Sequence, residues 1–395
     1  MRLEPASETE LAARVREAAA ARTPLAIEGG GSKRAWLRPV QAAATLSCAA
    51  LSGITLYRPQ ELVISARAGT PVAVIEAALA AKGQQLISEP YDLAALMGGG
   101  APAAPTLGGL VATNLSGPRR IAWGATRDHV LGVRAVNGSG GIFTSGGRVL
   151  KNVTGLDLCK LLAGSFGTLA VLSEITLKVL PAAESSATVV IGTADPAAGV
   201  AALAAGLGSP FGVSAAAYLP EEAASRAGLA RAAAILRIED FAASVAYRAD
   251  ALARRLQGEV MADAASRALW RRVRGLAPLA AAPDQAVWKL SVPPSAGPGL
   301  VRAILATLPA NWFMDWGGGL VWLAAEASER AHTAITRATV GARGVWQLVR
   351  APDGLRAAID VIPPEPPALA AIGARVKAVM DPHGILNPGR MRAGL

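Results

Sequence analysis

Short helical and strand patterns alternate along the first 181 residues of the chain. Apolar residues recur at helical spacing over residues 8–21, and Ser7 stands before them in the position of an N-cap. A short apolar run at Leu25–Ile27 predicts a strand. The stretch that follows it, "GGGSKRAW" (29–36), lacks the pattern of a long amphipathic helix. The pattern therefore predicts helix, strand and a glycine-rich loop in that order.

Residues 61–88 form the clearest strand–helix–strand pattern. A strand is predicted over 62–66, then a helix from Pro71 to about Lys82 with Thr70 as its cap, then a strand over 85–88. Proline suits the first helical position because its missing N–H would have no partner there. These patterns predict compact α/β units in this part of the chain.

The stretch at 97–117, "MGGGAPAAPTLGGLVATNLSG", has little regular pattern. Long irregular segments inside compact domains are usually functional or mobile. This one is not charged like a linker, so we expect a buried loop that faces a ligand. Beyond it, strands are predicted over 130–136 and 141–144, and residues 161–181 predict a helix, a glycine turn and a strand over 171–179.

The texture of the sequence changes after Pro181, where alanine-rich helical patterns and short strands dominate. We expect a first domain over 1–181 and a second domain over 182–368. A helix over 369–380 and a turn-rich tail predict that residues 369–395 return to the first domain. The predicted fold class is α+β with two domains.

Composition narrows the class of function. The 395 residues are 52% hydrophobic and carry a formal net charge of +10, with the basic residues mostly as scattered arginines, so a nucleic-acid partner is not expected. Cys48 and Cys159 are too few for a four-thiolate iron–sulfur cluster or a disulfide framework. No pair of histidines has metal-ligand spacing, so no metal is expected. A cytoplasmic location without a signal peptide or a transmembrane segment is expected.

The run "AIEGGGSKRAW" (26–36) raises the question of phosphate binding. A P-loop needs Ser or Thr after its lysine, but Arg34 follows Lys33. A dinucleotide fingerprint needs a third glycine where Arg34 stands. Glycines can still bring backbone N–H groups together around an anion, with Lys33 adding charge. A tight turn with solvated cations is the alternative.

Five segments in a fixed order resemble one superfamily of flavoproteins. They are "EGGGSK" (28–33), "TLGGLVATNLSGPRR" (106–120), "GATRDHVLGVRAVNGSG" (124–140), "KNVTGLDLCKLLAGSFGTLAVLSEITLKVLP" (151–181) and "DPHGILNPGR" (381–390). Together they resemble the flavoproteins related to vanillyl-alcohol oxidase and p-cresol methylhydroxylase. "VWKLSVP" (287–293) and "WFMDWGGGLVWL" (312–323) look more particularly like the FAD-binding subunits of bacterial glycolate oxidases.

The resemblance implies a two-lobed, p-cresol-methylhydroxylase-type FAD-binding domain followed by a smaller α+β cap domain. It implies that the first glycine loop lies against the FAD pyrophosphate and that three further loops complete the cradle. The cofactor-binding residues expected on this basis are Gly29, Gly30, Gly31, Ser32, Lys33, Thr106, Leu107, Gly108, Gly109, Asn114, Ser116, Gly117, Gly124, Ala125, Thr126, Gly167, Thr168, Leu169 and Val171.

The chain also departs from that superfamily. Phe166 and Ala170 stand where many relatives have an acidic residue and a glycine. Members that attach flavin covalently often use a histidine of the first loop, which has none here, so non-covalent FAD is expected. Relatives that oxidise D-2-hydroxy acids have clustered histidines in the second domain, where His332 stands alone. No catalytic residue is assigned.

The resemblance implies a subunit that takes part in oxidising glycolate, a small 2-hydroxy acid, to glyoxylate. Hydride passes to the flavin, and electrons then pass singly to an iron–sulfur subunit. A homologous flavoprotein subunit is the other expected partner, and any association with a membrane is expected through the complex. Two alternatives stay open: a self-sufficient FAD oxidase or dehydrogenase of a sugar acid or lactone, and a non-catalytic subunit that only holds FAD.

Several polar residues allow two interpretations each. Arg119 and Arg120 suit either a phosphate or partner contact or an ordinary surface position. Lys151 and Asp157 are expected to position the helix that follows them. Asp315 is expected to be a buried, hydrogen-bonded carboxylate, with a role as general base left open.

Overall fold

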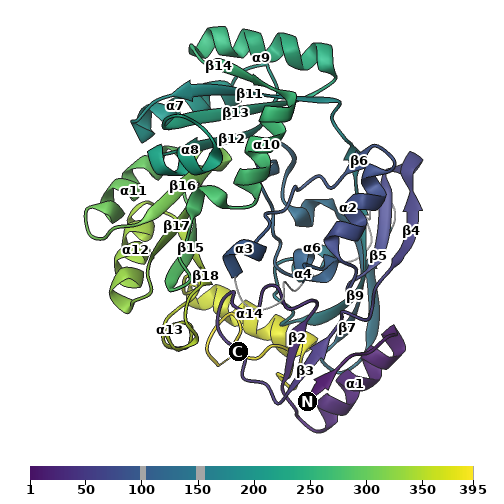
Figure 1. The fold of residues 1–395 in the computed structure, drawn as a ribbon. Helices are drawn as coiled ribbons and strands as arrows, with labels where there is room; N and C mark the ends of the chain where they lie inside the picture. Colours follow the sequence, from purple (N-terminus) through teal and green to yellow (C-terminus); the bar gives the residue numbers. More distant parts are fainter. Residues whose placement is uncertain (98–103, 148–155, 395) are drawn as a thin grey trace.

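The computed structural model describes residues 1–97, 104–147 and 156–394. In these ranges the chain forms a three-stranded sheet, a five-stranded sheet and a two-stranded pair in its first part, and one large sheet in its second part (Figure 1). This architecture confirms the predicted α+β class with a two-lobed first domain and a further α+β region. The expected boundaries at 181 and 368 stay predictions, although the large sheet begins at Ser185.

The first lobe is built on a parallel three-stranded sheet with strand order β1-β3-β2. Helix α1 packs on it because Leu11 and Val15 turn a buried face inward. Ser7 caps α1 as predicted, since its hydroxyl accepts from the Glu10 N–H at 3.1 Å. The elements of this lobe are β1 (Arg2–Leu3), α1 (Glu8–Ala20), β2 (Leu25–Glu28) and β3 (Ala44–Ser47).

The second lobe is an antiparallel five-stranded sheet with strand order β4-β5-β9-β7-β8. Its central strand β9 is buried along most of its length because helices cover one face and the first lobe packs nearby. The strands are β4 (Ile54–Arg58), β5 (Val63–Arg67), β7 (Val130–Asn137), β8 (Ile142–Gly146) and β9 (Ala170–Lys178), and a separate short pair joins β6 (Gln84–Gln85) to β10 (Leu180–Pro181).

The second part of the chain folds around an antiparallel eight-stranded sheet, β14-β11-β13-β12-β16-β17-β15-β18. Alanine fills many of its inner positions, as in β12, where all seven residues are buried. The strands are β11 (Ser185–Gly192), β12 (Val213–Leu219), β13 (Ala233–Asp240), β14 (Glu259–Ala262), β15 (Gln285–Ser291), β16 (Asn311–Asp315), β17 (Leu320–Glu326) and β18 (Val345–Arg350).

Most helices of the second part cover the large sheet, whereas helix α14 (Pro367–Met380) lies beside β2 of the first lobe and short helices lie between the sheets (Figure 1). The short ones are α2 (Val72–Ala80), α3 (Ala94–Met97), α4 (Leu107–Ala112), α5 (Arg120–Trp123) and α6 (Leu158–Leu162). The others are α7 (Pro196–Leu207), α8 (Glu221–Ala227), α9 (Ala242–Leu256), α10 (Asp263–Arg274), α11 (Gly297–Leu305), α12 (Glu329–Gly341), α13 (Asp353–Ala358) and α14 (Pro367–Met380). No helix of the described ranges is both long and apolar enough to cross a bilayer.

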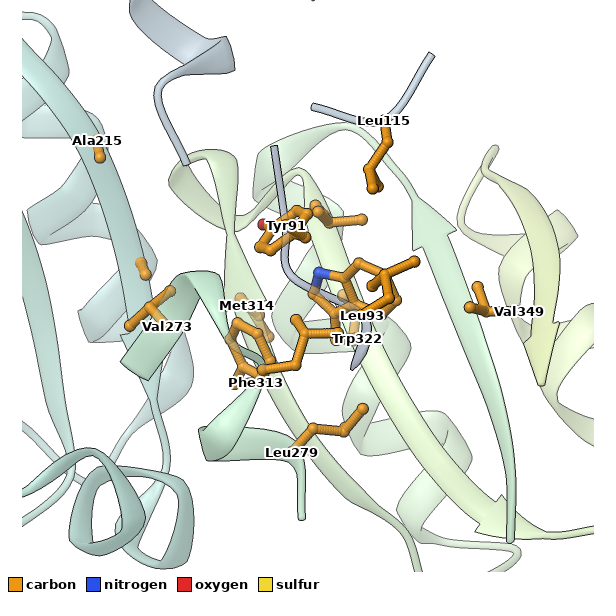
Figure 2. Packing of buried hydrophobic residues seen from close by; sticks show 14 of the residues in the cluster. Tyr91, Leu93, Leu115, Ala215, Val273, Leu279, Phe313, Met314, Trp322 and Val349 are labelled. Atoms are coloured by element: carbon orange, nitrogen blue, oxygen red, sulfur yellow. The ribbon is translucent and has the colours of Figure 1, made fainter. Parts of the chain in front are cut away.

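The segment around Tyr91 joins the first part of the chain to the large sheet. The Tyr91 ring meets the Trp322 indole edge-to-face, with 5.2 Å between ring centroids, and Phe313 and Leu93 fill the space around them (Figure 2). Buried aromatic contacts of this kind add to the free energy gained by removing apolar surface from water. The apolar core is therefore continuous across the junction.

Three details differ from the sequence patterns. Pro71 is the N-cap of α2 rather than its first residue, because the Thr70 hydroxyl donates instead to the Arg67 carbonyl at 2.7 Å. The strand predicted over 85–88 is a two-residue strand, Gln84–Gln85. The stretch over 97–117 contains a helix, α4, which its glycines had concealed; residues 98–103 of that stretch lie outside the described residues.

Candidate functional site

A cavity of about 500 Å³ lies where both lobes, the second part of the chain and the C-terminal tail meet. Its wall is made mostly of small residues and backbone from loops, because those residues leave room between the elements that carry them. The wall consists of Ala26, Ile27, Glu28, Gly29, Gly30, Gly31, Ser32, Lys33, Arg34, Ala35, Pro39, Val40, Thr45, Cys48, Ala68, Thr106, Gly108, Gly109, Ala112, Thr113, Ser165, Phe166, Gly167, Ala170, Val171, Leu172, Asp353, Arg356, Asn387 and Arg390.

The glycine loop after β2 is shaped by close backbone approach. Gly31 has a φ of +80°, which favours glycine. A Cβ on Gly30 would lie 2.1 Å from the Ala104 carbonyl oxygen, and one on Gly29 would lie 2.1 Å from the Thr106 hydroxyl. These glycines therefore let the loop pack against the segment that leads into α4. The whole predicted run Gly29–Lys33 lies on the cavity wall.

Helix α4 presents its first turn to the same cavity. Thr106 caps the helix, since its hydroxyl accepts from the Gly109 N–H at 3.3 Å. A Cβ on Gly108 would lie 2.9 Å from the Ala68 side chain, so glycine allows this turn to sit close to β5. Thr106, Gly108 and Gly109 all line the cavity, as do Gly167 and Val171 from the turn before β9 and from β9 itself.

The cavity is rich in cations that lack a full set of partners. Burial lowers the pKa of Lys33 to about 8, and its ammonium has one hydrogen bond within the described residues, to the Ser32 hydroxyl at 3.4 Å. Arg356 is 4% exposed; its guanidinium pairs with Asp353 and donates to the Leu37 carbonyl, but its Nε has no partner among the described residues. Burial, and then the charge of Arg356, lowers the pKa of Arg390 to about 10. A phosphate-bearing ligand would offset the cost of keeping these charges here.

Other expected cofactor residues lie away from the wall and hold two loops together. The Ser116 hydroxyl accepts from the Thr126 N–H at 2.9 Å, and the Asn114 side chain accepts from the Arg127 N–H at 2.9 Å. The Thr126 hydroxyl donates to the Leu115 carbonyl at 2.6 Å. The expected residues outside the wall are Leu107, Asn114, Ser116, Gly117, Gly124, Ala125, Thr126, Thr168 and Leu169. Their direct contact with a cofactor stays a prediction.

The wall also carries charged residues that the expected set does not contain, among them Arg390 and Arg356. Arg390 lies in the tail motif "DPHGILNPGR", so that motif could have indicated it. Arg356 lies on α13 of the second part, in no motif, and reaches the Leu37 carbonyl at 2.7 Å. The tail is tied to the first lobe because the Asn387 side chain accepts from the Ile27 N–H at 2.7 Å.

Arg119 belongs to a buried network of charges rather than to the cavity. Its guanidinium donates to Glu239 at 2.6 Å, and Arg237 donates to Glu89 at 2.6 Å and pairs with Glu239 at 3.0 Å. Although burial raises it, the pKa of Glu239 falls to about 2 because Arg237 and Arg119 favour its charged form. Arg119 and Glu89 come from the first part and the other two from β13, so the network links the two parts.

His332 and His129 lie outside the cavity wall. His332 is buried on α12, where its Nδ1 accepts from the Trp288 indole N–H at 3.3 Å and burial lowers its pKa. Burial also lowers the pKa of His129.

Asp157 positions α6 as predicted, because its side chain caps the helix by accepting from the Lys160 N–H at 3.2 Å, whereas Lys151 lies outside the described residues. The described residues hold no cluster of ligands suited to a metal ion.

Comparison with known proteins identifies the family. The family described as "FAD binding domain" matches residues 1–146. The glycolate oxidase subunit GlcE of Escherichia coli (strain K12) is 35% identical over 382 residues, which cover 96% of each chain. The chain belongs to the GlcE family. It is an FAD-dependent oxidoreductase subunit, so the flavoprotein resemblance of its sequence is confirmed.

Other known proteins match a shorter segment of the sequence or the fold alone. Glycolate oxidase subunit GlcD of Bacillus subtilis (strain 168) is 40% identical over 83 residues, 21% of this chain and 18% of that protein. A solved structure of alkyldihydroxyacetonephosphate synthase superposes with a TM-score of 0.68 at 17% identity, covering 98% of this chain and 75% of the other. That likeness shows the shared fold. The cavity fits FAD because its wall combines close-packed glycines with under-partnered cations.

Proposed function

We propose that this chain binds FAD non-covalently in the cavity and takes part in oxidising glycolate to glyoxylate within a glycolate oxidase complex. The observation that carries the proposal is the set of cations around the glycine loop, where Lys33 has one hydrogen bond within the described residues and the Nε of Arg356 has none. When bound, FAD supplies the capacity to accept hydride from the substrate α-carbon. The protein supplies position and charge.

The glycine loop and the two cations would hold the pyrophosphate. Backbone N–H groups of Gly29–Lys33 would donate to phosphate oxygens, and Lys33 and Arg356 would neutralise their charge. Thr106 and Gly109 would lie along the remaining length of the cofactor, with Gly167 and Val171 opposite. The other expected contacts, from 114–117 and 124–126, would be indirect, through the hydrogen bonds that position those loops.

Non-covalent binding is supported by the chemistry of the wall. Cys48 is its one thiol among the described lining residues, and burial raises the pKa of this thiol to about 12. A thiol that stays protonated is a poor nucleophile. No histidine stands among those lining residues.

The onward path of electrons requires a partner. Cys48 and Cys159 are the chain's two cysteines and both are buried, so the chain cannot bind a four-thiolate cluster by itself. We therefore propose an iron–sulfur subunit and a homologous flavoprotein subunit as partners. The relative in Escherichia coli is itself named a subunit. The proposed location is the cytoplasm, with membrane contact, if any, made by the complex.

The experiment starts with the absorbance spectrum of the purified chain. Acid precipitation should leave all yellow colour in the supernatant, and a yellow pellet would contradict non-covalent binding. Glycolate is then added anaerobically to the chain alone and to the chain reconstituted with its partner subunits. Bleaching in the complex that exceeds the flavin carried by the partner subunits supports the proposal.

The same measurement separates the alternatives. Full bleaching and steady turnover by the isolated chain would favour a self-sufficient oxidase or dehydrogenase. A lactone and a sugar acid are then tested in place of glycolate, because they are the substrates that this alternative expects. An FAD that never bleaches, even when the complex turns over glycolate, would favour a subunit that only holds its cofactor.

A further inference from the structure

Two cationic side chains meet on the indole of Trp316. The Arg120 guanidinium carbon lies 4.3 Å from the ring centroid, and the Lys289 ammonium lies 5.3 Å from it. Arg120 belongs to α5 and Lys289 to β15, so the pair forms where the first part of the chain meets the large sheet. Neither residue lines the FAD cavity. The pair is therefore a separate feature of the junction.

Neither cation has an acceptor within residues 1–97, 104–147 and 156–394. By contrast, the neighbouring Arg119 donates to the Glu239 carboxylate at 2.6 Å, so its charge has a partner. Burial, and then the Arg120 charge, lowers the pKa of Lys289 to about 8. Burial also lowers the pKa of Arg120. Holding two like charges together without an acceptor is costly, unless an anion joins them.

The indole fixes the geometry of this pair. Its N–H donates to the Gly117 carbonyl at 3.0 Å, and the backbone N–H of Trp316 donates to Asp315 at 2.6 Å. The ring is thus anchored to both parts of the chain. A guanidinium that stacks on an indole keeps its N–H edge free for a planar acceptor, and an ammonium supplies a point charge beside it.

We propose that Arg120 and Lys289 form a binding site for the carboxylate of a small 2-hydroxy acid. This assignment rests on the proposed function for the identity of the acid. The carboxylate would accept from the guanidinium edge and from the ammonium, over the indole. Arg120, Lys289 and Trp316 are all half-buried at a junction between domains, which suits a small acid better than an acidic side chain of a partner protein.

The pair would set specificity for an anion. A carboxylate satisfies both cations, whereas a neutral amide of the same shape leaves one of them unpaired. Tyr91 and Asp315 lie on the same junction, joined by a 2.6 Å hydrogen bond. Asp315, a titratable carboxyl, therefore directly precedes Trp316, whose indole carries the two cations.

The test is calorimetric titration of the full, FAD-loaded chain with oxalate and with glycolate, and with glycolamide as the neutral analogue. Saturable binding of the two acids and none of glycolamide are expected at pH 7. Lys289→Met and Arg120→Gln should each weaken oxalate binding about tenfold or more, whereas Lys289→Arg should retain it. Affinity of the unaltered chain should fall as the pH rises through about 8, and Lys289→Arg should remove that fall.

Matched variants separate the loss of this site from the loss of any lysine charge. Lys82→Met and Lys160→Met each remove an exposed lysine, and neither should change oxalate affinity. Oxalate binding that Lys289→Met leaves unchanged, or equal binding of glycolamide, overturns the inference. No oxalate binding alongside glycolate turnover by the complex also overturns it and leaves the proposed function standing. Oxalate binding that requires Lys289, in a complex without glycolate turnover, supports the site and contradicts the proposed function.

Discussion

The Tyr91 hydroxyl donates a 2.6 Å hydrogen bond to Oδ2 of Asp315, across the boundary between the FAD-binding part and the large sheet. Asp315 is fully buried, and its other oxygen accepts from the Trp316 N–H at 2.6 Å. Burial raises the pKa of this carboxyl from 3.8 to about 6, despite the two hydrogen bonds. The junction thus contains a carboxyl that titrates well above its ordinary range.

Asp315→Asn should change how stability depends on pH. In the unaltered chain, the folded state holds the Asp315 proton more tightly than the unfolded state, so this group lowers the free energy of unfolding as pH rises from about 4 to 6, by roughly 3 kcal/mol in all. Asparagine does not titrate; its oxygen can accept from the Trp316 N–H, while its amide N–H donates to the Tyr91 hydroxyl oxygen. The variant should therefore gain stability relative to the unaltered chain as pH rises, measured by urea unfolding at several pH values. Parallel curves would show that Asp315 does not carry this dependence.

Glu239→Ala should cost about 3–5 kcal/mol of stability, because it leaves the buried guanidiniums of Arg119 and Arg237 with the single carboxylate of Glu89 between them. Thermal and denaturant unfolding measure the loss. Glu222→Ala is the matched control, since Glu222 forms an exposed ion pair with Arg226 on one helix at 3.0 Å, and it should cost no more than about 0.5 kcal/mol. Equal losses in the two variants would mean that the network does not join the domains energetically.

Gly30→Ala should destabilise the chain by about 1–3 kcal/mol and lower its FAD content, because the new Cβ would meet the Ala104 carbonyl at 2.1 Å. Gly299→Ala, on α11, is the control: a Cβ there meets nothing within 4 Å, and the added helix propensity should be neutral or slightly stabilising. FAD per chain and the melting temperature report the two effects. Full FAD content in Gly30→Ala would argue against the first loop as the pyrophosphate site.

Lys33→Met should weaken FAD binding about tenfold or more, since it removes a charge-assisted contact to phosphate. The pKa of Lys33 near 8 adds a second signature. FAD affinity should fall as pH rises through this value in the unaltered chain, and the fall should be absent in Lys33→Met. Fluorescence titration of the apo-chain with FAD measures both. Lys160→Met, which alters an exposed lysine, should leave the affinity unchanged.

The sequence predicted those structural features that depend on residues close together in the chain. Ser7 caps its helix as expected, and Asp157, expected to position α6, does so as its N-cap, because a cap depends on residues a few positions away. Helix α4 was hidden because two glycines lower helix propensity, and tertiary packing against Ala68 offsets that cost.

The site was predictable only where a motif carries it. The run Gly29–Lys33 can be recognised in the sequence from its three glycines and its lysine. Arg356 reaches the cavity from α13, more than 300 positions later, because the domains pack together, and no spacing rule connects the two. The pairing of Arg120 with Lys289 depends in the same way on a junction that only the folded chain forms.

The bond between Ile27 and Asn387 joins residues 360 positions apart. A ribosome delivers the glycine loop early and the Asn387–Arg390 wall late, so the cavity is complete only after nearly all of that intervening chain has been synthesised. On the proposed function, FAD would therefore load after translation of the C-terminal tail rather than during synthesis of the first lobe.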